Sequence, residues 1–180
     1  MASSTTRLMS FAEFERLPDS PLRARYELRH GEVFQVPPPK HRHLLAQYRL
    51  QALLKAAARD AGEVGTELPY RPLPDFEYWY ADVGFVTRDR WERISPNGNL
   101  QGAPELVIEV LSPSNTVSEM LDRRNVCLEN SAREFWLVNI DHRSVEVSTP
   151  DGRSITFKSG QAIALFFAPG ASLAVDAIFD

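Results

Sequence analysis

Three stretches of the chain carry hydrophobic residues at the spacing of a helix. The first is short and begins at Ser10 and Glu13, which stand in capping-box spacing. The second runs from residue 41 to about residue 61, where leucines and alanines recur at helical spacing, and Gly62 is its expected stop. The third covers residues 115–132. Its expected hydrophobic stripe consists of Val117, Met120, Leu121 and Leu128.

Most of the remaining chain alternates hydrophobic and polar residues, which is the pattern of strands with one buried face. Residues 25–36 predict two short strands around a turn at His30 and Gly31. Residues 88–102 are rich in turn-forming residues and predict a loop. The other expected strands lie within residues 63–73, 76–87, 103–115, 133–141, 144–152 and 154–160, and the tail from residue 168 alternates before a final turn. This order predicts an α/β fold in which a mixed sheet is flanked by helices.

The segment APELVIEVLSPSN, residues 103–115, combines a strongly hydrophobic strand with one acid. Its β-branched centre and flanking prolines predict a short strand buried on both faces, yet Glu109 stands inside it. An ionised carboxylate there costs several kcal/mol unless it is paired, hydrogen-bonded or bound to a metal. Glu109 is therefore a candidate functional residue, and an ion pair with a nearby arginine is the plain structural alternative.

A second acid, Asp82, interrupts the aromatic-rich segment EYWYADVGFVT. A period of two places Asp82 on the same strand face as Tyr80 and Val86. If this strand neighbours that of Glu109, the two carboxylates lie about 5 Å apart, where two negative charges repel by about 3 kcal/mol at an effective dielectric constant of about 20. Either one of the two acids is protonated, or a hard divalent cation, Mg²⁺ or Mn²⁺, lies between them, where it would polarise a phosphate and activate water. The alternative is that Asp82 ends a strand and hydrogen-bonds to a loop.

The composition is that of one globular domain of 180 residues, and residues 1–9 are expected to form a flexible N-terminal arm. The net charge of −4 is not the signature of a general nucleic-acid binder. Residues 40–59 contain five cations and no acid, which is more typical of a solvated helix face than of a nucleic-acid-binding patch.

Cys127 is the one cysteine, so no disulfide or cysteine zinc site is expected, and a role in the core is favoured over that of a nucleophile. No apolar run suits a membrane span and no secretory signal is evident, so the expected location is the cytoplasm.

Six segments carry a resemblance to a known family: RYELRHGEV, HRHLL, ADVGFV, PELVIEVLSPSN, EFWLVNID and APGASLAVDAIF. From about residue 10 to its end, the chain resembles the Uma-type restriction-endonuclease family, a branch of the PD-(D/E)XK nuclease superfamily. The most specific parts are IEVLSPS and EFWLVN at their separation. The resemblance implies a restriction-endonuclease-like mixed sheet between helices, and a divalent metal held by Asp82 and Glu109 with the Val110 carbonyl as a further ligand. It also implies intracellular bacterial proteins that are often dimeric.

The chain departs from the family pattern at the position of a lysine. The superfamily motif has a lysine two residues after the glutamate, where this chain has Leu111, and the Uma-type family supplies the lysine from the next helix instead. The distance to EFWLVN aligns that lysine with Arg123, whereas helical periodicity brings Arg124 nearer the hydrophobic stripe, so either arginine is a candidate. An arginine holds phosphate charge but stays protonated and cannot act as a base. Other departures are Ala81 for a proline, Cys127 for an aromatic residue and Ser131 for a glycine.

The resemblance adds two further candidate site residues. Glu27 matches a recurrent family acid, with an edge-strand ion pair as the alternative. His43 matches a recurrent histidine that would donate to a metal-bound water or a phosphate, with a half-buried or capping histidine as the alternative.

Two functions are compatible with these residues. The first is a Mg²⁺- or Mn²⁺-dependent endonuclease that hydrolyses DNA, with Asp82, Glu109, Arg123, Glu27 and His43 as site residues. The second is a catalytically degenerate module that binds nucleic acid or a protein partner. The missing lysine favours the module, and the retained acid pair favours the enzyme. A homodimer without membrane contact is the expected assembly.

Overall fold

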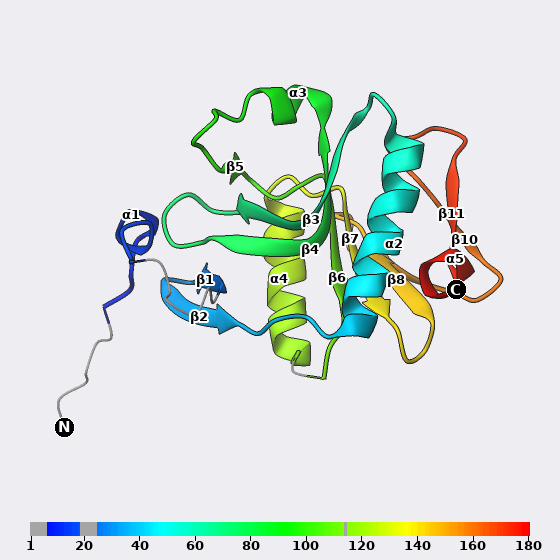
Figure 1. Ribbon diagram of the computed structural model, residues 1–180, viewed down its shortest axis with the longest axis horizontal. Helices are drawn as coiled ribbons and strands as arrows, with labels where there is room; N and C mark the ends of the chain where they lie inside the picture. The colour runs from blue at the N-terminus through cyan, green and yellow to red at the C-terminus, as the bar shows by residue number, and fades with distance from the viewer. Residues whose placement is uncertain (1–6, 19–24, 114) are drawn as a thin grey trace.

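The computed structural model describes residues 7–18, 25–113 and 115–180, and a mixed sheet forms the centre of this part of the chain (Figure 1). Its strands are β3 (Gly62–Arg71), β4 (Trp79–Thr87), β5 (Leu100–Gln101), β6 (Leu106–Val110), β7 (Glu134–Asn139), β8 (Ser144–Ser148) and β9 (Ser154–Lys158). They lie side by side in the order β5-β3-β4-β6-β7-β8-β9. The β6–β7 and β3–β5 pairs are parallel, and the other neighbours are antiparallel. The predicted mixed sheet is therefore confirmed.

Two small hairpins and five helices complete the described structure. The hairpins are β1 (Arg25–Arg29) with β2 (Glu32–Val36), and β10 (Ala162–Ala164) with β11 (Ser172–Ala174). The helices are α1 (Phe11–Phe14), α2 (His41–Ala58), α3 (Arg88–Glu92), α4 (Val117–Glu129) and α5 (Asp176–Phe179). The capping box predicted at the start of α1 is formed by Ser10 and Glu13. No helix within the described residues is long and apolar enough to span a membrane.

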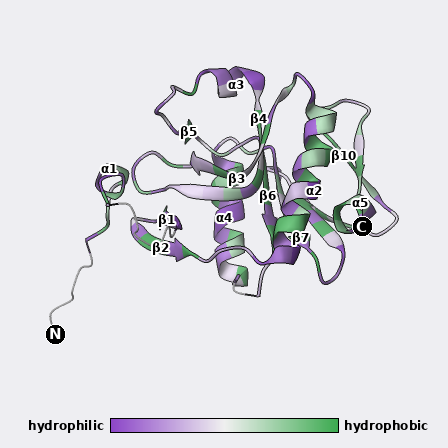
Figure 2. Ribbon diagram, viewed as in Figure 1, coloured by the Kyte–Doolittle hydropathy of each residue, from purple (hydrophilic) through white to green (hydrophobic). Residues whose placement is uncertain are grey.

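Helices α2 and α4 cover opposite faces of the sheet (Figure 1). The face of α2 that carries Leu50 and Leu54 packs on β4 and β6, and the C-terminal segment from Ile163 to Ile178 extends this core. The smaller core on the other face brings Cys127 of α4 against Val107 of β6 and other residues of β4 and β7. Figure 2 shows α2 banded in hydrophilic and hydrophobic residues, as expected for a helix with one buried face.

The hairpin of β3 and β4 changes face in its middle. Val64 and Val83 belong to the core beneath α2, whereas Leu68 and Ala81 belong to the core beneath α4, although a period of two would keep each pair on one face. The change occurs at Glu67, whose φ of 51° interrupts the extended backbone. The ladder pairs the residues on both sides of Glu67 and skips Glu67 itself.

This change of face corrects one sequence-based prediction. Val86 packs in the core beneath α4, while the Asp82 carboxylate is hydrogen-bonded to a side chain of α2. Asp82 therefore does not share a face with Val86, because the backbone irregularity lies between the regular halves of the hairpin. A rule of strict alternation fails where a residue adopts a positive φ.

Three other predictions about elements are wrong in part. Helix α2 ends at Ala58 with Arg59 at a φ of 47°, and Gly62 begins β3 instead of ending the helix. Residues 88–102 include helix α3 and strand β5, where a loop was expected. On α4, Val117 is 77% exposed and the buried residues are Met120, Arg123 and Cys127. The predicted N-terminal arm, residues 1–9, stays a prediction, because residues 1–6 lie outside the described residues.

Gly62 is required by the close approach of β3 to β4. A Cβ atom added at this position would lie 2.1 Å from the Val86 carbonyl oxygen, so Gly62→Ala should lower the free energy of unfolding by about 1–3 kcal/mol. At Gly65 the nearest atom to an added Cβ is the mobile end of the Leu68 side chain at 3.3 Å, so Gly65→Ala should cost clearly less. Urea unfolding of both variants checks this difference, and equal losses would contradict it.

Candidate functional site

Glu27, Arg123 and Glu109 form a buried network of charges between β1, α4 and β6. The Arg123 guanidinium donates to Glu27 Oε2 at 2.6 Å and to Glu109 Oε1 at 3.1 Å. It also donates to the Tyr80 carbonyl at 3.0 Å and lies 5.0 Å from the centroid of the Trp79 ring. The side chains of the three charged residues are 3–10% exposed. We call these residues, together with Arg29, which donates to Glu27 Oε2, the arginine network.

Asp82 stands at the centre of a second network on the side of α2. Its Oδ2 accepts from the Val110 amide at 2.7 Å, and its Oδ1 accepts from Gln47 Nε2 at 2.8 Å. His43 Nε2 lies 3.1 Å from Oδ1. We call these residues, together with Glu67 and Arg25, the aspartate network, because Gln47 also donates to Glu67 and Glu67 is paired with Arg25.

The two networks meet where β4 lies beside β6. The antiparallel register pairs Val83 with Ile108, which brings Asp82 to the strand position next to Glu109. The negative charge of Asp82 accordingly acts on the titration of Glu109. The predicted adjacency of the two acidic strands is thus confirmed. The hydrogen-bond partners of the acids nevertheless come from opposite faces of the sheet, from α2 for Asp82 and from α4 for Glu109.

Burial dominates the electrostatics of Glu109. It raises the pKa of this carboxyl to about 8, while the charge of Arg123 acts in the opposite direction and that of Asp82 in the same direction. For Glu27, burial also opposes ionisation, but Arg123, Arg29 and the Tyr80 amide together hold its pKa below the usual range. Burial also opposes the charge of Arg123. The negative charges of Glu109 and Glu27 outweigh this effect and raise the pKa of the guanidinium above its usual value. The surroundings thus favour the ionised form of Glu27, whereas burial favours the protonated form of Glu109.

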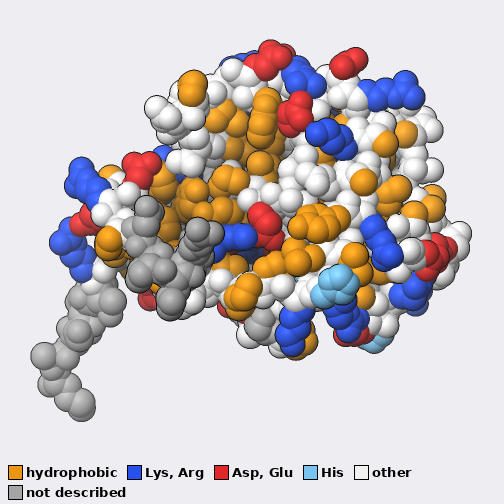
Figure 3. Space-filling model, viewed as in Figure 1, with side chains coloured by type: hydrophobic (Ala, Val, Ile, Leu, Met, Phe, Trp, Pro, Cys, Tyr) orange, Lys and Arg blue, Asp and Glu red, His pale blue; other side chains and the backbone are white. Residues whose placement is uncertain are grey.

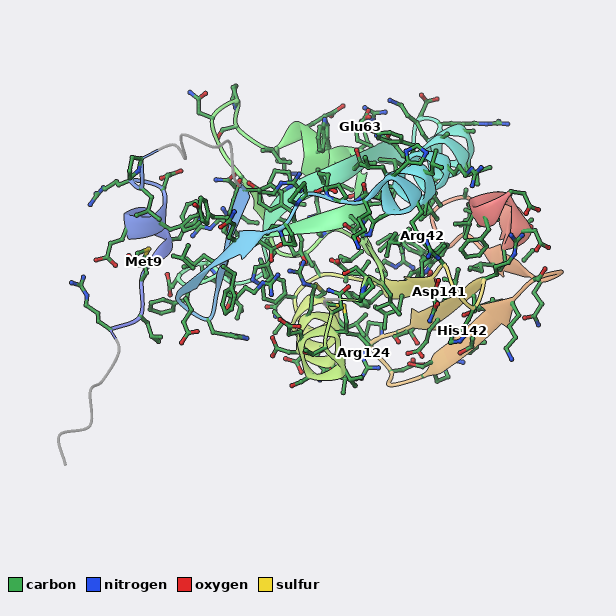
Figure 4. The ribbon with its side chains drawn as sticks, turned by 60° about the horizontal axis from the view of Figure 1, so that its bottom comes forward. Met9, Arg42, Glu63, Arg124, Asp141 and His142 are labelled. Carbon is green, nitrogen blue, oxygen red and sulfur yellow. The ribbon has the colours of Figure 1, made fainter. Side chains whose placement is uncertain are left out.

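The structure distinguishes between the two candidate arginines. Arg123 is buried and contacts Glu109, whereas Arg124 lies on the side of α4 that faces the last strands of the sheet (Figure 4). The nearest acid to Arg124 is Glu146 of β8, at 3.9 Å. The helical stripe favoured Arg124 wrongly, because the face that α4 turns to the sheet includes the charge that the buried acids require.

The other site predictions have mixed outcomes. His43 is half-buried against Asp82. Glu27 forms an ion pair, which was the alternative to a role in the site, but its partner is the site arginine Arg123. The alternative for Glu109, a pair with an internal arginine, is also present, again with Arg123. Leu111 follows β6 and donates its amide to Val138.

Two departures from the family pattern also have a structural setting. Cys127 is fully buried beside the Tyr70 hydroxyl, and burial raises the pKa of its thiol to about 12, so it is a core residue. Ser131, which replaces an expected glycine, has a φ of 93°, a conformation that glycine adopts without strain.

Sequence reasoning missed Gln47, Glu67 and Arg25. Gln47 is fully buried and follows His43 by four positions, so both side chains lie on one face of α2. That spacing was the one available signal. Glu67 and Arg25 join the network only because β1 and β3 meet in the folded chain. Gln47 Oε1 has no hydrogen-bond partner among the described residues, which leaves a buried oxygen acceptor beside Asp82.

The raised pKa of Glu109 predicts a pH-dependent loss of stability. Between its ordinary value of 4.5 and the folded value of about 8, the folded chain keeps a proton that the unfolded chain releases, so the wild type loses stability as the pH rises through this window. The Glu109→Gln variant lacks this proton. Relative to it, the free energy of unfolding of the wild type should fall by up to about 1.4 kcal/mol per pH unit. Urea unfolding from about pH 5 to about pH 8 measures the difference, and a constant difference would mean that Glu109 stays ionised against Arg123.

Removing the buried arginine should cost far more stability than removing its neighbour. Arg123→Met leaves the Glu27 and Glu109 carboxyls buried without their cation, which should lower the free energy of unfolding by about 3–5 kcal/mol. Arg124→Met removes only the long contact to Glu146 and should cost less than about 1 kcal/mol. Chemical denaturation of both variants tests this. Similar losses would show that the arginine network does not stabilise the fold.

The chain is similar to proteins of one known family and to one solved structure. The model of the Uma2 family, described as "Putative restriction endonuclease", matches residues 11–176. A crystal structure of "a putative nuclease belonging to DUF820" from Anabaena variabilis superposes with a TM-score of 0.80 at 21% sequence identity, covering 95% of this chain and 97% of that one. No curated protein matches the chain. The structural likeness confirms the restriction-endonuclease-like fold class, and the family match covers nearly all of the described residues. The chain therefore belongs to the Uma2 family.

Proposed function

We propose that this protein is a divalent-metal-dependent nuclease that hydrolyses phosphodiester bonds of DNA. The observation that carries this proposal is the meeting of Asp82 and Glu109 on neighbouring antiparallel strands, each acid backed by its own hydrogen-bond network. Membership of the Uma2 family supports a nuclease function in general. Families of this kind generally use divalent metals.

The chemistry of the donor atoms fits a hard cation such as Mg²⁺ or Mn²⁺. Asp82 and Glu109 would hold it through carboxylate oxygens, and the unpartnered Gln47 Oε1 is a third oxygen on the aspartate side. The described residues contain no group of three or more histidine, cysteine or acidic side chains that could enclose a metal. A site with only two carboxylates suits Mg²⁺, which commonly binds through one or two carboxylates and keeps waters or substrate phosphates as its other ligands.

A bound cation supplies Lewis-acid polarisation of a phosphate and lowers the pKa of water. The protein's own residues have separate tasks. His43 and Gln47 hold the Asp82 carboxylate in one orientation. Arg123 keeps its charge beside Glu109 and stabilises negative charge that develops on a phosphate, but it does not take a proton from water. Glu27 and its second partner Arg29 hold that guanidinium in place.

A second candidate function is a degenerate nuclease-fold module that binds nucleic acid without cutting it. The observation that favours it is that the Arg123 guanidinium already has hydrogen-bond partners within the protein. Its guanidinium is committed to Glu27, Glu109 and the Tyr80 carbonyl, at the position where the family supplies a lysine. Both candidates share the binding of nucleic acid and differ in the rate of hydrolysis.

Cleavage of supercoiled plasmid DNA in Mg²⁺ or Mn²⁺, combined with calorimetry of Mn²⁺ binding, tests the proposal. The wild type should bind about one Mn²⁺ per chain and cut the DNA, and Asp82→Asn or Glu109→Gln should remove both properties. Arg123→Lys should raise the cutting rate, because an ammonium is smaller than a guanidinium and can lose its proton.

Arg124→Lys serves as the matched control, since Arg124 lies near Glu146 and away from the acids. It should leave cutting and metal binding unchanged. If the wild type binds Mn²⁺ equally well after both acid substitutions, the metal site is assigned wrongly. If neither the wild type nor Arg123→Lys cuts DNA while both bind it, the second candidate replaces the first.

A further inference from the structure

A cavity of about 370 Å³ opens between α1, β1 and β4. Phe11, Phe14, Tyr78 and Tyr80 line it, and we call it the aromatic cavity. Figure 3 shows hydrophobic side chains gathered between α1 and the β3–β4 hairpin in this region. The volume lies within the range of pockets that hold small organic groups.

Strand β4 connects the aromatic cavity to the candidate site. Tyr80 and Asp82 are alternate residues of β4, and Tyr78 directly precedes this strand, whereas Trp79 and Ala81 between them are buried in the core beneath α4. Alternate residues of a strand stand about 6.7 Å apart along one face. This is close to the spacing of successive nucleotides in an extended strand, so a phosphate near Asp82 brings a neighbouring base to the tyrosines.

Tyr80 contributes to both the aromatic cavity and the networks of the candidate site. Its amide donates to Glu27 Oε1 at 2.9 Å and its carbonyl accepts from Arg123 at 3.0 Å, so its backbone is part of the arginine network. Its ring lies 4.8 Å from the guanidinium of Arg25, which is paired with Glu67 of the aspartate network. The wall of the cavity is thereby tied to both sets of site residues.

The rings form one connected aromatic surface. The centroid of Tyr78 lies 5.6 Å from that of Phe11, 5.6 Å from that of Phe14 and 5.3 Å from that of Tyr80. Phe11 is buried and anchors α1, but the two tyrosines keep exposed surface. Anchoring of α1 therefore explains the phenylalanines, whereas the two tyrosines remain partly exposed where they line the cavity.

The polar groups around this surface suit a base rather than a purely apolar ligand. Arg25 offers a positive charge and a planar surface, and Asn97 and Asn99 offer amides that can both donate and accept at a base edge. Glu15 is the one acid among the described lining residues, and it is exposed. Aromatic faces combined with cations are the surfaces on which proteins stack unpaired bases.

We infer that the aromatic cavity is a subsite for an unpaired nucleobase, held against Tyr78 and Tyr80 while the adjoining phosphate lies toward Asp82. The inference rests on the proposed function only for the class of ligand, nucleic acid, and not on hydrolysis. It assigns the preferred substrate as single-stranded DNA, or a duplex with an unpaired or extruded nucleotide beside the scissile bond. A fully paired duplex must first release a base from its stack, which costs free energy.

Binding without cleavage tests this subsite. The probes are a fluorescein-labelled oligothymidylate of about 12 nucleotides and a blunt hairpin duplex with the same label, both in EDTA and followed by anisotropy. The wild type should bind the single strand more tightly than the hairpin. Tyr80→Ala and Tyr78→Ala should each weaken binding of the single strand by roughly 5- to 150-fold. Tyr80→Phe and Tyr78→Phe retain the rings and should bind like the wild type.

Tyr48→Ala is the matched control, because Tyr48 is 56% exposed on α2 and does not line the cavity. It should bind like the wild type, and near-ultraviolet circular dichroism confirms that each variant is folded; Tyr78→Ala keeps the test decisive if Tyr80→Ala does not fold. Wild-type binding by folded alanine variants, a preference for the hairpin, or no binding of either probe would overturn the subsite. Tyrosine-dependent binding without cleavage by any variant would sink the nuclease proposal alone, and cleavage without tyrosine dependence would sink the subsite alone.

Discussion

The buried ion pairs of Arg123 are the interaction on which the arrangement of this molecule depends. Arg123 comes from α4, and its partners come from β1, β4 and β6, so one guanidinium joins four elements that are distant in sequence. Charges in a protein interior are tolerated only where each is paired and hydrogen-bonded. The face that α4 turns to the sheet accordingly includes this arginine beside Met120 and Cys127. This orientation leaves Val117 exposed while an arginine is buried.

On the opposite face of the sheet, Asp82 is stabilised in a different way. Asp82 is held by neutral donors, the Gln47 amide and the Val110 amide, and by His43, so it can stay close to solvent at 17% exposure. The positive φ of Glu67 makes this possible, because the change of face in the hairpin turns Asp82 toward α2. The two acids thus lie on neighbouring strands in different surroundings: Glu109 is buried and its pKa is raised, whereas Asp82 is hydrogen-bonded and partly accessible.

The same arrangement links chemistry to recognition. Tyr80 contributes its peptide group to the arginine network and its ring to the aromatic cavity, so any shift of β4 moves both together. The small hairpin of β1 and β2 does likewise, since Glu27 contacts the arginine and Arg25 contacts the Tyr80 ring. An acidic protein needs no broad basic surface if a substrate is held by a few stacked bases and a local cation.

Hydrophobic period, capping and the cost of burying a carboxylate are local properties, and they predicted most of the helices and strands, the mixed sheet and the two acids in apolar strands. The sequence also indicated the arginine in place of a lysine. The choice between Arg123 and Arg124 required the folded chain, since it rests on contacts of Arg123 with Glu27 and Glu109, which are distant from it in sequence. Likewise, the roles of Gln47 and Glu67 exist only where α2 packs on a hairpin whose alternation is broken. A periodic pattern carries no information about the one residue at which the backbone leaves the period.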